Sequence, residues 1–247
     1  MLTLPTLGPS ERGKVPQSLL RDVWRASELA IARSTAQTTG YDLLDRELPD
    51  RGWPRSALIE LLVQQNGIGE MQLLQPMLSP LSSSQRVVLI QPPYHPHLMA
   101  CRAWNVNERN LLWLRPKSSS DALWATEQTL KSGNCGGVIL WQTDIRPETL
   151  RRLNLAAQTT DTWFWLMRPI SAASNASPSP LRIALRPVHG GLSVDIVKRR
   201  GPYCENPLFI SLTSMPVGRQ PSENDYETPG KRSSTIIATR STTPELV

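Results

Sequence analysis

A chain of 247 residues is long enough for one sizeable hydrophobic core with some flanking sequence left over. Its hydrophobic content of 39% suits a globular domain, and the lack of an apolar run of about 18 residues argues against a membrane-spanning helix. The net charge of +6 suits an anionic partner but does not require one, since many basic proteins bind no nucleic acid.

The cysteines and the N-terminus bear on the cellular compartment. Cys101, Cys135 and Cys204 are few and odd in number, which favours a reducing cytoplasm over a disulfide framework. Prolines near the N-terminus interrupt the unbroken apolar segment that a signal peptide needs. We therefore expect a cytoplasmic protein that does not associate with membranes.

The first 39 residues are expected to form a lead-in, a short helix and a polar linker. Within residues 16–34, Leu20, Trp24 and Ile31 recur at helical spacing, which predicts an amphipathic helix. The polar stretch STAQTTG then leads to Gly40, where the main domain is expected to begin.

From residue 40 to about residue 168, strand-like apolar runs alternate with segments that suit helices. The predicted strands are 57–63, 86–91, 111–114, 137–142 and 162–168, and the predicted helices are 70–81, 97–104, 120–131 and 147–158. Near-continuous apolar strands separated by helices indicate a parallel sheet covered on both faces.

The pattern changes after this alternation. Two alternating runs, 181–186 and 192–198, flank His189-Gly190-Gly191, which predicts an antiparallel β-hairpin. The main domain is thus expected over residues 40–212. Residues 213–247 are rich in Ser, Thr and Pro and poor in apolar residues, so we expect a disordered tail.

The first predicted strand leads into a glycine turn. Asn66-Gly67-Ile68-Gly69 follows the strand, and a predicted helix begins at Glu70. Strand, glycine turn and helix form the layout of a phosphate-binding loop, in which backbone N–H groups and the helix N-terminus attract an anion. Such a loop carries Lys and then Ser or Thr, but this chain has Glu70 and Met71 at these positions.

The stretch TGYDLLDRELPDRGWPRSALIELLVQQNGIGE, residues 39–70, resembles the opening of the RecA recombinase core. The resemblance is closer to the ImuA family, RecA-like accessory proteins of bacterial translesion synthesis, and to the related SulA cell-division inhibitors. The ImuA-like segments are VWR at 23–25, ELPDRGWPRSALIELL from Glu47, GIGE at 67–70, LMRP at 166–169 and the hairpin segment that ends at Pro202. LKSGNCGGVILW and FWLMRPISAASNAS also look SulA-like.

The resemblance implies a RecA-like α/β domain with a mostly parallel sheet, helices on both faces and a C-terminal antiparallel hairpin. ATP hydrolysis in such a core needs the loop lysine, a hydroxyl on magnesium, a carboxylate that orients water and an aspartate near the metal. Glu70 would face the phosphates with a negative charge, and Met71 offers magnesium no hard oxygen. Where RecA places its glutamate, the chain reads Gln91-Pro92-Pro93-Tyr94, and the expected aspartate falls on Trp141 or Gln142, with Asp144 too late by simple spacing. We therefore expect a degenerate loop (Gly67, Gly69, Glu70, Met71) without a cofactor, and no enzymatic activity.

By resemblance, the chain is an accessory factor of the SOS response that binds an ImuB-like protein and an error-prone DnaE-type polymerase. RecA itself is a further expected partner. The alternative is a SulA-like inhibitor that binds FtsZ, and a third hypothesis is an active nucleotide-dependent recombinase. The degenerate loop argues against the third. The VWR helix and the hairpin favour the ImuA-like function over the SulA-like one, because SulA proteins are shorter.

Basic and aromatic side chains supply the candidate contacts with partners or DNA. These candidates are Trp24, Arg25, Arg182, Arg186, Lys198, Arg199 and Arg200. The basic residues can cluster at the end of the sheet and meet phosphates, or they can form a solvated strand terminus. Trp141, Trp163 and Trp165 lie in predicted strands and are expected in the core, whereas Trp24 and Trp53 are either core residues or partner anchors.

His95, His97 and Cys101 are close enough in sequence to raise the question of a metal site. The segment lacks a second paired cluster, and histidines next to prolines commonly start helices. We therefore predict a structural role and no metal. No Ser/His/Asp set and no paired catalytic carboxylates stand out in the sequence.

Overall fold

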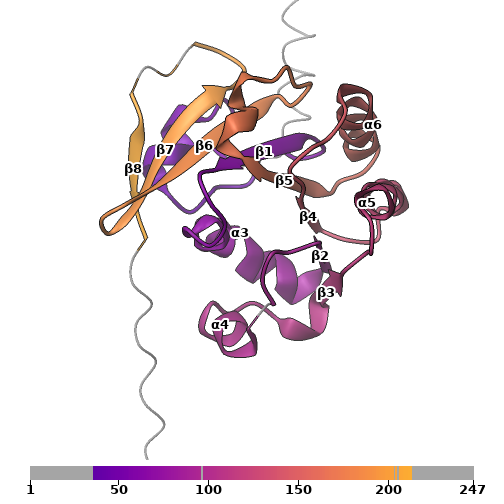
Figure 1. The fold of residues 1–247 in the computed structure, drawn as a ribbon. Helices are drawn as coiled ribbons and strands as arrows, with labels where there is room; N and C mark the ends of the chain where they lie inside the picture. Colours follow the sequence, from indigo (N-terminus) through magenta and orange to yellow (C-terminus); the bar gives the residue numbers. More distant parts are fainter. Residues whose placement is uncertain (1–35, 96, 203, 205, 213–247) are drawn as a thin grey trace, which may run out of the picture. The chain divides into compact units, whose positions relative to one another are not determined.

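The computed structural model describes residues 36–95, 97–202, 204 and 206–212 (Figure 1). The predicted N-terminal helix, with Trp24 and Arg25, and the predicted disordered tail from residue 213 lie outside the described residues. None of the helices in the described ranges has the length and apolarity needed to cross a bilayer.

An eight-stranded sheet in the order β3-β2-β4-β5-β1-β6-β7-β8 organises the described part of the chain. The strands are β1 (Leu58–Val63), β2 (Val87–Ile90), β3 (Leu111–Leu114), β4 (Gly137–Trp141), β5 (Trp163–Pro169), β6 (Leu181–Val188), β7 (Gly191–Lys198) and β8 (Leu208–Ser211). Strands β1 to β6 are mutually parallel where they pair, and β7 pairs antiparallel with both β6 and β8. The predicted α/β class, the mostly parallel sheet and the hairpin are therefore confirmed.

Helices cover both faces of the sheet (Figure 1). They are α2 (Asp42–Glu47), α3 (Glu70–Ser84), α4 (Leu98–Ala103), α5 (Ser119–Ser132) and α6 (Pro147–Gln158), with short 3₁₀ turns η1 (Glu108–Asn110) and η2 (Ile170–Ser174). Side chains of α3 and α4 pack on one face with Ile59 and Leu61 of β1, while those of α5 and α6 pack on the other with Leu58. Successive strand residues point to opposite faces, so a strand buried on both sides is mostly apolar along its whole length.

Tryptophans form part of the core. Trp141, Trp163 and Trp165 are 8%, 6% and 0% exposed, which confirms their predicted core positions. Trp53 is also 0% exposed and meets Trp165 edge to face, with ring centroids 6.3 Å apart. Its alternative role as a partner anchor is therefore wrong, because no part of the ring reaches the surface.

Two elements were not predicted. Helix α2 has six residues, too few for a helical repeat, and the Asp45 carboxylate accepts a hydrogen bond from the Thr39 N–H at 2.8 Å just before it. Strand β8 has four residues and pairs with β7. Such short segments carry little periodicity of their own, and their structure depends on contacts with the rest of the fold.

Candidate functional site

The carboxyl ends of four parallel strands meet at one edge of the sheet. β1 ends at Val63 and continues into the glycine turn, while β2, β4 and β5 end beside it in the order that the sheet imposes. Ligands of open α/β sheets bind outside the carboxyl ends of the strands. This edge is therefore the place where a nucleotide would be sought.

The glycine turn is already occupied by a side chain of the protein. The Gly67 N–H donates to Glu70 Oε1 at 2.8 Å, and the Gly69 N–H donates to Glu70 Oε2 at 3.1 Å. Both glycines have positive φ angles, 84° and 117°, which favour glycine and turn their N–H groups toward the carboxylate. Glu70 is 3% exposed. An internal carboxylate thus accepts the N–H groups that the loop would offer to a phosphate.

The surroundings of the loop are apolar. Met71 is partly buried against the main core, and with Gly67, Gly69 and Glu70 it lines a cavity of about 330 Å³. Leu212 follows β8 and lies on Gly69, where an added Cβ would come within 2.3 Å of Leu212 Cδ1. Glycine is therefore required at position 69 by a close contact as well as by its backbone conformation.

Two glutamines directly follow β2 and β4 at this edge of the sheet. The Gln142 side-chain amide donates to Gln91 Oε1, and the Gln91 amide donates to the carbonyl oxygens of Pro116 and Ser118 at 3.3 and 3.5 Å. Gln91 has a φ of 51°, a left-handed conformation that is uncommon for a residue other than glycine. Neutral amides bonded to each other neither accept a proton from water nor neutralise magnesium.

Arg182 is an interior residue. It is 4% exposed, its Nε donates to Glu60 Oε2 at 3.0 Å, and its remaining N–H groups donate to carbonyl oxygens around η2. The sequence predicted a contact with a partner or DNA here. That placement is corrected: the alternation of β6 turns Arg182 toward Glu60, which was not visible without the neighbouring strand.

The other predicted basic residues divide into two groups. Arg199 donates to the side chain of Glu47 at 2.8 Å and to its carbonyl oxygen, and its side chain is 13% exposed. Lys198 and Arg200 are exposed, and Lys198 Nζ donates to the Ser177 carbonyl oxygen at 2.8 Å. Arg199 therefore joins β7 to α2, whereas Lys198 and Arg200 are the residues available to a partner.

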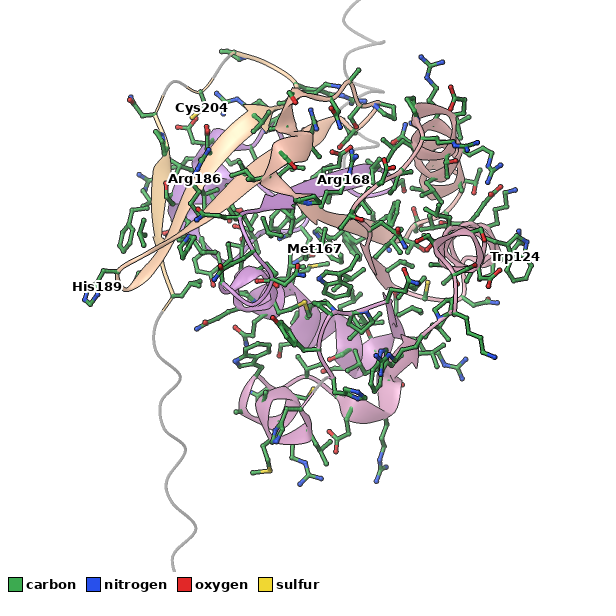
Figure 2. All side chains as sticks on the ribbon, in the orientation of Figure 1. Trp124, Met167, Arg168, Arg186, His189 and Cys204 are labelled. Atoms are coloured by element: carbon green, nitrogen blue, oxygen red, sulfur yellow. The ribbon has the colours of Figure 1, made fainter. Side chains whose placement is uncertain are left out.

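Arg186 lies apart from Lys198 and Arg200. In the hairpin Arg182 is opposite Lys198, while Arg186 is opposite Ser193, close to the turn. Figure 2 shows Arg186 on the hairpin and His189 at its tip. Arg186 lies 3.8 Å from Asp195 and its side chain is 46% exposed. Arg186 therefore lies near the turn of the hairpin, apart from Lys198 and Arg200 at the far end of β7.

A buried charge cluster was missed by the sequence reasoning. Glu60, Arg168 and Arg182 are at most 4% exposed, and Glu60 Oε2 lies 3.7 Å from Arg168 Nη1. The available signal was a charged residue within an apolar strand, in LIELL and in FWLMRP. Charged residues are seldom fully buried unless they are paired, so a charged residue in such a strand indicates an oppositely charged neighbour in the fold.

His95 contacts an arginine and a tryptophan side chain of the protein. His95 Nε2 lies 3.0 Å from Arg115 Nη1, and its ring meets Trp113 edge to face. Cys101 is buried, and this burial raises the pKa of its thiol, as does the nearby Glu108 carboxylate. Within the described ranges, no group of three or more His, Cys, Asp or Glu side chains is placed to hold a metal ion.

Of three comparisons with known proteins, only the comparison with solved structures finds matches. No protein-family model matches the sequence, and a search of curated proteins finds no relative. Among solved structures, the chain is similar to SulA from Pseudomonas aeruginosa, with 26% sequence identity over 45% of this chain and 97% of the SulA chain. The TM-score of 0.39 indicates limited structural agreement.

Proposed function

We propose that this chain is a non-catalytic, RecA-like accessory protein of the DNA-damage (SOS) response. In this proposal it supports error-prone translesion DNA synthesis by binding an ImuB-like protein and a DnaE-type polymerase. RecA is a further proposed partner, and DNA is a further proposed contact. The proposal needs no cofactor.

The observation that carries the non-catalytic part is the Glu70 carboxylate on the glycine N–H groups. A phosphate would have to displace a buried carboxylate and then lie beside its negative charge, without a lysine to offset the repulsion. The Gln91–Gln142 pair supports the same conclusion, because a neutral amide does not take a proton from water as a carboxylate does.

The accessory role is supported by the ImuA-like segments and their positions in the fold. These segments supply β1, the glycine turn, the end of β5 and the β6–β7 hairpin. A strand, glycine turn and helix in the interior of a parallel sheet is also the arrangement from which a phosphate-binding loop is built. A fold that keeps this arrangement without its chemistry retains surfaces for binding proteins.

ATP hydrolysis tests the non-catalytic part. We expect no release of phosphate from Mg-ATP above the uncatalysed background, either with the protein alone or with the ImuB-like protein present. The reason is that the lysine, the hydroxyl and both carboxylates are missing from their expected positions. Turnover above background that is lost with Glu70→Ala would contradict the proposal.

Capture of purified partners tests the accessory role. We expect the full chain to retain the ImuB-like protein and the DnaE-type polymerase, and not to retain FtsZ. The opposite result, retention of FtsZ alone, would favour the SulA-like alternative. This experiment is independent of the ATP assay, since binding and hydrolysis can fail separately.

Variants locate the partner contact. We expect Trp24→Ala, or the double change Lys198→Ala/Arg200→Ala, to weaken binding of the ImuB-like protein by about tenfold, or about 1.4 kcal/mol. Arg109→Ala is the matched control, because Arg109 is an exposed arginine on η1. If Lys198 and Arg200 meet DNA instead, their loss should lower the salt dependence of DNA binding by up to about two units of log–log slope. Wild-type binding by both variants would refute this placement of the interface.

A further inference from the structure

A cavity of about 510 Å³ opens at the carboxyl ends of β1, β2, β4 and β5. Its walls include the guanidinium-bearing residues Arg115 and Arg168 and the amide-bearing residues Gln64, Gln65 and Asn66. None of the described residues that line it is acidic. The cavity is therefore positively charged and rich in hydrogen-bond donors.

Arg168, near the end of β5, is the unusual member of this lining (Figure 2). It is 3% exposed, and its Nε and Nη1 atoms have no hydrogen-bond partner among the described residues. Glu60 Oε2 lies 3.7 Å from Arg168 Nη1, beyond hydrogen-bond distance. A buried guanidinium with unused donors is costly for the fold, because burial removes its hydration without replacing the lost hydrogen bonds.

The charges around Arg168 do not balance. Glu60 is hydrogen-bonded to Arg182 Nε at 3.0 Å through one oxygen and to the Ser177 hydroxyl through the other. Arg168 and Arg182 therefore share the single carboxylate of Glu60. Both of its oxygens already accept hydrogen bonds, one from Arg182 and one from Ser177. Two guanidinium charges against one carboxylate leave one positive charge uncompensated in the interior, and an anion in the adjoining cavity would offset it.

The open side of the cavity offers further attraction to an anion. Arg115 is exposed, and Ser119 places the first turn of α5 in the wall. The N-terminus of this 14-residue helix carries a partial positive charge and backbone N–H groups without partners inside the helix. The side-chain amide of Gln91 donates to the carbonyl oxygens of Pro116 and Ser118, in the segment that precedes α5.

We propose that this cavity is an oxyanion site that takes a carboxylate or phosphate group, with Arg168 at its inner wall and Arg115 at its opening. The site is separate from the Glu70 carboxylate in the glycine turn. The inference rests on the buried Arg168 and on the lining of the cavity, and it stands whether or not the accessory role proposed above is correct.

Thermal unfolding of the full chain with two magnesium-free probes tests the proposal. Inorganic phosphate and N-acetylglutamate are titrated at constant ionic strength, with chloride as the reference salt. A ligand that binds only the folded state raises the melting temperature in a saturable way. We expect this rise for at least one probe, and the stronger probe identifies the natural ligand as a phosphate or a carboxylate. No saturable rise with either probe at millimolar concentrations would overturn the proposal.

Variants tie the effect to the cavity. Arg168→Met fills the space of the side chain without its charge, and we expect it to abolish the saturable rise. Arg115→Gln should raise the dissociation constant by about tenfold, since one charge-assisted hydrogen bond is lost. Arg109→Gln removes an exposed arginine that does not line the cavity and should behave as wild type. If Arg168→Met does not fold, Arg115→Gln decides: an unchanged dissociation constant in that variant would overturn the proposal.

Discussion

At the scale of single residues, Glu70 changes the glycine turn in two ways at once. It removes the cation that a phosphate-binding loop needs, and it supplies an anion that the loop N–H groups bind. A neutral residue at this position would remove only the cation and leave the N–H groups open to another acceptor. The negative side chain supplies an internal acceptor for both N–H groups, which stabilises the turn.

Replacement of Glu70 should therefore cost stability. Glu70→Ala leaves the Gly67 and Gly69 N–H groups without their acceptor, and we expect a loss of about 1–3 kcal/mol in the free energy of unfolding. Glu70→Gln is the control: it retains one carbonyl oxygen as an acceptor, so its loss should be smaller. Urea denaturation of the three proteins gives the comparison. Equal stability of Glu70→Ala and wild type would show that the carboxylate does not support the turn.

At the scale of elements, charged side chains join segments that do not share a strand pair. Glu127 of α5 bonds Lys131 at 2.8 Å within its own helix and Arg152 of α6 at 3.0 Å. Arg199 at the end of β7 bonds Glu47 at the end of α2. The Glu127–Arg152 and Arg199–Glu47 pairs bring together different elements, so their effect belongs to the packing of the elements and not to one residue.

The Glu127 link should depend on pH. The hydrogen bond from Lys131, followed by the charge of Arg152, lowers the pKa of the Glu127 carboxyl, while burial opposes them. Because the folded pKa lies below the unfolded one, the stabilisation is present above the unfolded value of about 4.3 and is lost as the pH falls through the folded pKa. Glu127→Gln should thus lower stability by up to about 1 kcal/mol at neutral pH and make no difference in strong acid. Melting temperatures of both proteins across this pH range check the sign; a larger difference in acid would contradict it.

We expect Arg199 to contribute to the stability of the fold, and Lys198 and Arg200 to contribute little. Arg199→Ala removes a largely buried ion pair and a hydrogen bond to a carbonyl oxygen, and we expect a loss of about 1–3 kcal/mol. The double change Lys198→Ala/Arg200→Ala should stay within about 0.5 kcal/mol of wild type, since both side chains are exposed. Chemical denaturation measures both. A double variant less stable than Arg199→Ala would reverse this assignment.

At the scale of the whole molecule, the described chain depends on its last strand. Ile210 of β8 is 2% exposed in the main core, and Leu212 packs against the same core and on Gly69. β8 also pairs with one edge of β7, and β6 pairs with the other edge. The end of the domain and the glycine turn, distant in sequence, therefore support each other.

Truncation tests this dependence. A chain that ends at residue 212 should have a free energy of unfolding within about 0.5 kcal/mol of that of the full chain, because the removed sequence is poor in apolar residues. A chain that ends at residue 207 loses β8, and burial of Ile210 alone is worth about 1.5–3 kcal/mol. Thermal unfolding of the two truncated chains should therefore show a large fall for the shorter one only. Equal melting temperatures would mean that β8 contributes nothing to the core.

The sequence by itself determined the elements of the central sheet. The apolar runs of β1 to β5, the helical spacing of α3 and α5 and the glycine hairpin are local patterns, so their predicted bounds agree with the structure to within a few residues. The absence of a lysine and a hydroxyl after the glycine turn was also visible in the residues themselves. Such features depend on backbone preferences and side-chain chemistry that act over a few residues.

The tertiary structure decided which residues meet. Glu60 and Arg182 are 122 residues apart in sequence, and Gln91 and Gln142 are 51 apart, yet each pair is in direct contact. Strand alternation predicts which residues share a face, but the order of strands in a sheet is not written in any one strand. Arg182 was therefore expected at the surface, and the buried Arg168 guanidinium, whose Nε and Nη1 lack hydrogen bonds, became visible only when β5, β1 and β6 lay side by side. Burial and pairing are properties of that arrangement, because they depend on neighbours that only the folded chain supplies.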